Sequence, residues 1–509
     1  MNNSVIRYIL GRVLRLLGFF LLLPCVVSLI YQDLEGLYFI ATAAGSYLAG
    51  FLLSRSRPAD FHFGLKEGCI ATALSWILMS LIGCLPFFFS GEIPSFFDAL
   101  FETVSGFTTT GASILTDVEA LSHTALFWRS FTHWIGGMGV LVFLLAVMPL
   151  SGGSGTNLMK AESPGPSVGK LVPKARQTAR LLYLIYIGMT LAEIVLLLIG
   201  QVPAFDAVTI SLGTAGTGGF GVRNSSCAEY SVYAQWVIAI FMMLFGVNFN
   251  MYYLILFRRF RKALSMEEVR TYFGIIICSV AVITLTICHS VAGIFSSITD
   301  AFFQVTSIIT TTGYSTVNFD LWPQTARMIL VFLMFTGACA GSTGGGIKVS
   351  RVVLLLKTVK KELVYYIHPK SIKKIHMDGK PIEHDVQRST NVYFVTFFAI
   401  FVTSMFLISF EKTDLVTTFT AVTATMNNIG PGLSMVGPVE NYGFFSNFSK
   451  VVLMFDMLAG RLELFPLLIL LHPAAWKEFL LKQTVIRQKR WKDFFRKLKS
   501  KSDASKIDK

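Results

Sequence analysis

The chain has 509 residues, of which 53% are hydrophobic and only 15% are charged, and its apolar residues gather in runs of about 20, the length of a membrane-spanning helix. This composition excludes a soluble globular protein and predicts a chain that crosses a membrane several times. The formal net charge of +14 does not indicate nucleic-acid binding, because the basic residues lie between and after the apolar runs, as in cytoplasmic loops, and not on one soluble domain.

Residues 1–66 are predicted to form a retained transmembrane hairpin. The apolar run Leu16–Tyr31 follows several arginines, as in a secretory signal, but no small-x-small cleavage site follows it. A second apolar run, Leu37–Leu53, comes at once. The loop after this run contains Arg55 and Lys66, which places that loop and the N-terminus in the cytoplasm.

From residue 67 onward, one unit recurs four times. Each copy has an apolar helix, an acidic residue, a short amphipathic segment, a glycine turn and a second apolar helix. The predicted copies are 67–178, 179–267, 268–388 and 389–481, and a basic cytoplasmic tail follows at 482–509. The predicted membrane helices, in pairs, are Cys69–Ser90 and Phe127–Leu150, Leu181–Gly200 and Ala234–Phe257, Tyr272–Phe295 and a helix from about Ala326, and Val392–Phe410 and Lys450–Leu471.

An aspartate precedes the turn glycine of each copy. Asp98, Asp206 and Asp300 each lie 13 residues before their glycine, whereas Asp414 lies 16 residues before its own. An aspartate at the start of a short helix caps free backbone amides, and the helix then directs its negative C-terminal end toward the turn, where a cation would sit. The alternative is four structural re-entrant turns that bind no ion.

The segments around these glycines have the form of a potassium-channel selectivity filter. Ile309–Ser315 contains Thr-x-Gly-Tyr, in which consecutive backbone carbonyls replace the hydration shell of an ion, and the glycine permits the conformation that turns them inward. Four such segments are what a closed filter needs. The candidate ion-binding residues, three from each copy, are Thr109, Thr110 and Gly111; Thr217, Gly218 and Gly219; Thr311, Thr312 and Gly313; and Asn428, Ile429 and Gly430.

Two features interrupt the second helices. In the third copy a loop of small residues, 337–346, falls at membrane depth, where non-helical backbone is tolerated only inside protein or beside water, so it is predicted to lie in the pore as a gate. In the fourth copy Arg461 lies near mid-membrane, where its charge would slow a permeating cation. The candidate gating residues are Gly341, Gly344, Gly345, Gly346, Lys348 and Arg461.

Each interruption has an alternative explanation. In the first alternative, the helix of the third copy ends early, and the glycines after it form a cytoplasmic loop. In the other, Arg461 forms a structural ion pair with Asp456 or Glu463.

The loops that join the copies are basic, and those that flank the glycine turns carry few Lys or Arg. The positive-inside rule therefore places all four turns toward the outside and both termini in the cytoplasm. Each copy returns the chain to the same side, so the copies are parallel repeats that can surround one axis. The predicted fold is an all-α polytopic membrane protein with an N-terminal helical hairpin and four parallel helix–pore-loop–helix repeats around a single pore.

Several motifs together carry a family resemblance over about residues 67–481. They are the four glycine turns with Phe127–Ser130, Trp134–Gly139, Gly341–Lys348, Asn427–Gly432 and Gly460-Arg461. With these motifs the chain resembles the TrkH/TrkG-type potassium uptake proteins of the Trk/Ktr/HKT superfamily of cation transporters. The additional N-terminal hairpin favours the TrkH/TrkG branch over the Ktr branch.

The resemblance implies uptake of K+ across the bacterial inner membrane by a protein that is not an enzyme. It implies a homodimer in membrane lipid with one pore per chain, a separate cytoplasmic RCK-type nucleotide-binding regulatory subunit, contact between the loop and Arg461, no nucleic acid, and no cofactor besides the transported K+. Three residues depart from the filter pattern. They are Gly218, where two other turns have Thr, and Ala112 and Pro431, which stand at the channel tyrosine position.

Two other functions remain open. A Na+-permeable or cation-coupled symporter would use the same scaffold, and its transport would depend on the coupling ion. A membrane-embedded enzyme would use Asp456, Arg461 and Glu463 on a lipid-linked substrate, but these acids have no partnered His, Ser or metal set in the sequence.

Overall fold

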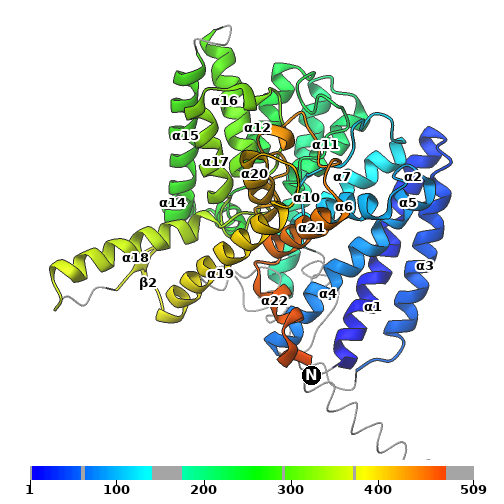
Figure 1. Ribbon diagram of the computed structural model, residues 1–509, viewed down its shortest axis with the longest axis horizontal. Coiled ribbons are helices and arrows are strands. Elements are labelled where there is room, and N and C mark those ends of the chain that lie inside the picture. The colour runs from blue at the N-terminus through cyan, green and yellow to red at the C-terminus, as the bar shows by residue number, and fades with distance from the viewer. Residues whose placement is uncertain (1–2, 59–63, 140–174, 289–292, 371–373, 477–509) are drawn as a thin grey trace, which may run out of the picture.

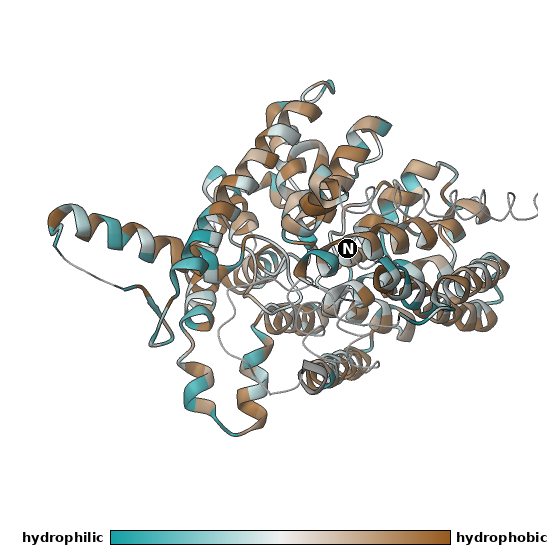
Figure 2. Cartoon of the chain, turned by 90° about the horizontal axis from the view of Figure 1, so that it is seen from below, coloured by the Kyte–Doolittle hydropathy of each residue, from teal (hydrophilic) through white to brown (hydrophobic). Residues whose placement is uncertain are grey.

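The structure, a computed structural model, describes residues 3–58, 64–139, 175–288, 293–370 and 374–476. Within these ranges the protein is a bundle of α-helices with one short β-hairpin (Figure 1). The described part contains six apolar helical spans that are long enough to cross a membrane, or seven if one bent helix pair is counted as a span. Hydrophobic residues extend along most of these helices (Figure 2), as contact with lipid requires. The chain is therefore an all-α polytopic membrane protein, as its composition predicts.

The N-terminal hairpin forms as predicted, and its two halves approach closely. A methyl group added to Gly11 would lie 2.7 Å from the backbone nitrogen of Ser54, and one added to Gly50 would lie 2.6 Å from the carbonyl oxygen of Gly11. Small residues allow such backbone packing where lipid leaves no hydrophobic driving force between helices. The hairpin consists of α1 (Asn3–Phe20) and α2 (Leu22–Tyr31), which make one span, and α3 (Gly36–Ser54).

We expect Gly11→Leu to destabilise this hairpin by about 1–3 kcal/mol, because the larger side chain would overlap the backbone of α3. The measurement is the midpoint of thermal unfolding of the purified chain in detergent. Gly45→Leu is the matched control, because an added methyl group at Gly45 meets no atom within 4 Å. An equal loss of stability in both variants would contradict the packing argument.

Each repeat places a short helix between longer elements, with the following bounds. The first repeat has α4 (Leu65–Gly83), α5 (Leu85–Ser90), α6 (Phe96–Phe107) and α7 (His123–Met138). The second has α10 (Ala175–Ile199), α11 (Ala204–Gly216), α12 (Val232–Phe245), α13 (Phe249–Leu256) and α14 (Phe260–Leu264). The third has α15 (Glu267–Ile287), α16 (Ile294–Ile309), η1 (Phe319–Leu321), α17 (Gln324–Thr336) and α18 (Val349–Ile367). The fourth has β1 (His376–Met377), β2 (Lys380–Pro381), α19 (His384–Ile408), α20 (Leu415–Met426), η2 (Ser434–Val436), α21 (Asn447–Arg461) and α22 (Phe465–Leu471).

Some predictions fall outside the described residues. They are the part of the predicted helix Phe127–Leu150 beyond Gly139, most of the basic loop that precedes α10, and the tail at 482–509. The predicted repeat boundaries stay a prediction, although every repeat has its short helix followed by a glycine turn.

The second helices of the second and fourth repeats are broken, which corrects the continuous helices predicted for Ala234–Phe257 and Lys450–Leu471. α12 and α13 meet at a bend of 92°. The side chain of Asn248 starts α13 afresh, because it accepts a hydrogen bond from the backbone of Asn250 at 2.9 Å. α21 ends at Arg461, and Pro466 in the first turn of α22 cannot lie inside a continuous helix.

The four aspartates do not share one role, and the predicted capping role is wrong for three of them. Asp414 is the N-cap of α20 and accepts from two backbone amides of its first turn. Asp98 and Asp206 lie at the third helical positions of α6 and α11, and Asp300 lies in the second turn of α16. The longer spacing in the fourth repeat therefore reflects a cap three residues earlier, and Thr417 takes the position that corresponds to Asp98.

Candidate functional site

The short helices α6, α11, α16 and α20 lead directly into four turns with one backbone conformation. The first residue of each turn is not glycine, yet it has φ between 54° and 60°, and the last residue is glycine with φ between 78° and 95°. In every turn the middle N–H donates to the carbonyl five residues earlier, at 2.8–2.9 Å. We call these segments the glycine turns: Thr109–Gly111, Thr217–Gly219, Thr311–Gly313 and Asn428–Gly430.

The glycine turns abut one another in a closed ring. The carbonyl oxygen of the middle residue of one turn faces the glycine of a neighbouring turn, so closely that only glycine fits. An added methyl group would lie 2.1 Å from that oxygen between Gly111 and Gly218, 2.0 Å between Gly219 and Thr312, 2.1 Å between Gly313 and Ile429, and 2.7 Å between Gly430 and Thr110. Main-chain oxygens from all four repeats thus gather at one place, and they are the ligand type that suits a dehydrated alkali cation.

Side-chain hydroxyl and amide groups hold three of the turns in place through hydrogen bonds. The hydroxyls of Thr108 and Thr110 lie 2.8 Å apart, and those of Thr310 and Thr312 lie 2.7 Å apart. In the fourth turn, Asn428 Nδ2 donates to the hydroxyl of Thr110 at 2.9 Å, which connects the fourth turn to the first. These contacts hold the turns in a fixed geometry and join the two ends of the ring.

The second turn is braced differently, and this explains the departure at Gly218. A methyl group on Gly218 would lie 1.8 Å from Nδ1 of His133, a fully buried side chain of α7. The imidazole stacks on Phe220 with ring centroids 4.3 Å apart. His133 therefore occupies the space that a threonine side chain would need, and sequence reasoning missed it because the two residues are 85 positions apart.

A buried ion pair outside the ring connects the first turn to the second. Arg129 Nη2 and Glu102 Oε1 lie 2.7 Å apart, and both side chains are almost fully buried. Glu102 also accepts from the backbone of Ile114 at 3.0 Å, and Arg129 donates to the carbonyl of Gly221 at 3.1 Å. The sequence gives one usable signal for this pair, an arginine inside an apolar helix.

We expect Glu102→Ala to destabilise the protein by about 3–5 kcal/mol, because it leaves Arg129 as an unpaired buried charge. Thermal unfolding in detergent measures the loss, and the double variant Glu102→Ala/Arg129→Met should recover part of it. Glu229→Ala is the control, because Glu229 forms its pair with Arg223 at the surface and its loss should change little. A loss for Glu229→Ala as large as that for Glu102→Ala would refute the argument from burial.

The loop at 337–346 lies directly against the ring. The backbone N–H of Gly345 donates to the hydroxyl of Thr311 at 2.6 Å, and a methyl group on Gly345 would lie 2.5 Å from the carbonyl oxygen of Asn427. A methyl group on Gly344 would lie 2.7 Å from the carbonyl oxygen of Thr310. This position is incompatible with the alternative of a cytoplasmic loop. α17 ends at Thr336, as the predicted interruption requires.

Of the other predicted gating glycines, Gly346 lies at the end of the loop and Gly341 lies inside it. A methyl group on Gly346 would lie 2.7 Å from the Cα of Gly337, so the two ends of the loop touch. Gly341 accepts a hydrogen bond from the backbone of Phe249 at 3.0 Å, which ties the loop to the break between α12 and α13. Lys348 has φ 82°, and its buried ammonium donates to the carbonyl of Gly344 inside the loop.

Arg461 joins the loop to α7. Its guanidinium donates to the carbonyl of Thr343 at 2.8 Å, and on the other side to the carbonyls of Gly137, at 2.8 Å, and Gly136. The two acids considered as its ion-pair partners have partners of their own. Glu463 pairs with Arg351, and Asp456 accepts from the hydroxyl of Ser404 at 2.7 Å. Arg461 is thus in contact with the loop, and its role in a gate stays a prediction.

Comparisons with known proteins agree over nearly the whole chain. The family model TrkH, described as a cation transport protein, matches residues 38–477. The Trk system potassium uptake protein TrkH of Salmonella typhimurium is 35% identical, with 94% of this chain and 100% of that protein covered. The Trk system potassium uptake protein TrkG of Escherichia coli K12 is 31% identical over 94% of this chain and 100% of that protein.

A solved structure supports the same assignment. The crystal structure of the potassium transporter TrkH from Vibrio parahaemolyticus matches this fold with a TM-score of 0.84 at 31% sequence identity, covering 94% of this chain and 100% of that chain. These proteins are named for transport, which argues against the alternative of a membrane-embedded enzyme. From its sequence and its fold together, the chain belongs to the TrkH family of cation transport proteins.

Proposed function

We propose that this protein takes up K+ through one pore per chain, in which the ring of glycine turns is the selectivity filter. The observation that carries the proposal is the ring itself, because carbonyl oxygens of four repeats face one another's glycines in chain order. K+ entering from outside would exchange its water for these oxygens and for the threonine hydroxyls beside them. The inside-negative potential contributes about 2.3 kcal/mol per charge per 100 mV, so uptake needs no chemical step.

The four turns are chemically unequal, and this bears on selectivity. The second turn has no side chain at Gly218, and the carbonyl of Gly430 already accepts a hydrogen bond from Tyr442 at 2.7 Å. A ring with fewer equivalent oxygens discriminates less strictly between K+ and Na+. A Na+-permeable or cation-coupled transporter on the same scaffold is therefore the second candidate function.

The gate in this proposal is the loop at 337–346 together with Arg461. The loop contacts the third and fourth turns, and the arginine fastens it to α7. A fixed positive charge below the ring also repels a cation in transit. Ions would pass when the loop and Arg461 move apart.

The regulator in this proposal is a cytoplasmic RCK-type nucleotide-binding subunit, and the assembly is a homodimer in the bacterial inner membrane with both termini in the cytoplasm. One feature supports contact with other chains and a second supports the orientation. α18 projects from the bundle (Figures 1 and 2) and exposes Leu356, Val359, Leu363 and Tyr366. The short helix α14 carries Arg261 and Lys262, as the cytoplasmic side of a membrane protein does.

The test is uptake of labelled Rb+ into proteoliposomes that contain only this purified chain, under an imposed potential, with K+ or Na+ as competitor. Saturable uptake that K+ displaces far better than Na+ supports the proposal. Equal displacement by the two ions would favour the second candidate. Absence of uptake from both the native chain and Arg461→Ala would contradict a cation pathway.

A further inference from the structure

One buried carboxylate that the proposed gate does not include binds the chain on both sides of the part of the loop that contacts the ring. Glu268 lies in the first turn of α15, and only 4% of its surface is exposed. Its Oε1 accepts from the backbone N–H of Ala340 at 2.5 Å and from that of Ser350 at 3.2 Å. One oxygen therefore bridges the chain just before and just after the segment that contacts the ring.

The other oxygen of Glu268 fixes the carboxylate in place. Oε2 accepts from Asn248 Nδ2 at 3.1 Å, and the Oδ1 of the same amide caps α13 by accepting from the backbone of Asn250. The orientation of the amide is thus set by two partners at once. Glu268 on α15 thus joins the break between α12 and α13 to Ala340 inside the loop and to Ser350 in α18.

Three donors make this burial of a carboxylate tolerable and give it a directional role. Burying a charge without hydrogen bonds is costly, whereas hydrogen bonds to an ionised group are about twice as strong as neutral ones. Two of the three donors are backbone N–H groups of the loop and its exit, so these bonds form only when residues 340 and 350 are close together. Neighbouring backbone bonds agree, since Val349 donates to Ala338 at 3.0 Å.

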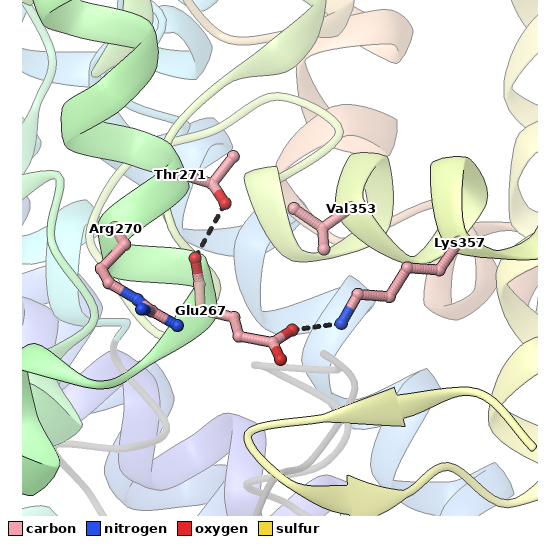
Figure 3. Close-up of a pocket in the computed structure, with 5 residues that line it drawn as sticks. All are labelled: Glu267, Arg270, Thr271, Val353 and Lys357. Carbon is pink, nitrogen blue, oxygen red and sulfur yellow. Dashed lines mark hydrogen bonds and ion pairs between the residues drawn. The ribbon is translucent and has the colours of Figure 1, made fainter. Parts of the chain in front are cut away.

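The adjacent acid faces a different environment. Glu267 pairs with Lys357 in a surface pocket of about 440 Å³ between α15 and α18, which is also lined by Arg270, Thr271 and Val353 (Figure 3). The side chain of Glu267 points toward Lys357 on α18. Two consecutive glutamates of one helical turn thus have separate tasks, one at the surface and one at the loop.

We propose that Glu268 is the positioning residue that clamps residues 340 and 350 on either side of the ring-contacting part of the gating loop and so keeps the loop against the ring. The inference rests on the proposed function of the loop as a gate. Arg461 holds the loop through Thr343, and Glu268 holds it through Ala340 and Ser350, so the two anchors are separate. Loss of the carboxylate frees residues 340 and 350 and raises the population of chains with a displaced loop.

The test is the initial rate of Rb+ uptake by the full chain in proteoliposomes without any regulator. Glu268→Ala should raise this basal rate roughly ten- to hundredfold, because it removes three hydrogen bonds to an ionised group. Glu268→Gln keeps the size and an acceptor oxygen but loses the charge, so it should give an intermediate increase and guards against failure of the alanine variant to fold. The Rb+ concentration at half-saturation should stay unchanged, because the ring is untouched.

The matched control is Glu267→Gln, which alters the next residue of the same helical turn and should leave the basal rate at the native value. Arg461→Ala is the reference for a gate whose loop is released from α7. Native rates for both Glu268 variants beside a raised rate for Arg461→Ala would overturn the clamp and leave the gate standing. Native rates for all variants, Arg461→Ala included, would overturn the gate and the clamp together.

Discussion

Gly313→Ser is expected to abolish the preference for K+ over Na+ in the uptake assay. An added Cβ at this position would lie 2.1 Å from the carbonyl oxygen of Ile429 and 2.9 Å from the ring of Pro431, and the backbone has φ 87°. The left-handed backbone alone costs a substituted residue roughly 1–2 kcal/mol. This energy corresponds to a factor of about 5–30 in an equilibrium, and displacement of the carbonyl of Ile429 adds to it.

The control separates backbone strain from contact within the ring. Gly91 has φ 80°, similar to that of Gly313, but an added Cβ there meets no atom within 4 Å. Gly91→Ser should therefore carry the same local strain and keep its K+ preference. The comparison is the ratio of K+ to Na+ concentrations that halve Rb+ uptake. An unchanged ratio in Gly313→Ser, in a variant that folds and transports, would refute the assignment of the ring as the filter.

Arg461→Ala is expected to raise basal Rb+ uptake by roughly ten- to hundredfold, because it removes three hydrogen bonds from a charged donor. The guanidinium joins the carbonyl of Thr343 in the loop to that of Gly137 in α7. Its removal both releases the loop and lowers the electrostatic barrier to a cation. The measurement is the initial uptake rate in the absence of a regulatory subunit.

Two further variants identify which property of Arg461 matters. Arg461→Lys keeps the charge but cannot hold carbonyls on two sides, so an increase in rate would assign the effect to the contacts. Arg12→Ala removes another membrane arginine, one that bonds to Tyr8 within α1, and should not change the rate. A folded Arg461→Ala protein with native basal uptake would show that this arginine is structural.

Hydropathy and local motifs were sufficient to predict the N-terminal hairpin, the first membrane helix of each repeat and the interruption of the third repeat. The pattern of small residues after Thr336 predicts the end of α17 because a run of glycines cannot continue a helix. The bend between α12 and α13 was missed because Asn248 and Asn250 are short polar interruptions of a long apolar stretch. Pro466 was a usable signal for the break after α21, since proline is tolerated only in the first turn of a helix.

The capping prediction is wrong for Asp98 because a nearby residue caps the helix instead. Ser95 lies three residues before Asp98, and its hydroxyl accepts from the backbone of Asp98, which is the role first assigned to the aspartate. The regular spacing of the aspartates predicts one shared capping role, and only Asp414 has it. In the structure Asp98 instead pairs with Lys450 of α21, a contact between residues more than 300 positions apart.

The contacts that complete the site are tertiary and were not predictable from single positions. His133 accounts for the glycine at 218 only when α7 is seen against the second turn. Glu268 is typical of an acidic residue in the first turn of a helix, which suits the helix dipole on a solvated face. Its burial against Ala340 and Ser350 depends on the folding of the third repeat around the loop and on Asn248 of the second repeat.

The measurement that tests the central claim most directly is rubidium anomalous diffraction from crystals of the native chain grown in RbCl. Rubidium replaces K+ and reports its position without reference to transport rates. The account predicts an anomalous peak inside the ring of Gly111, Gly219, Gly313 and Gly430, among the carbonyl oxygens of the residues that precede them. Crystals with well-ordered glycine turns and no peak in the ring, or with rubidium bound only elsewhere, would contradict it.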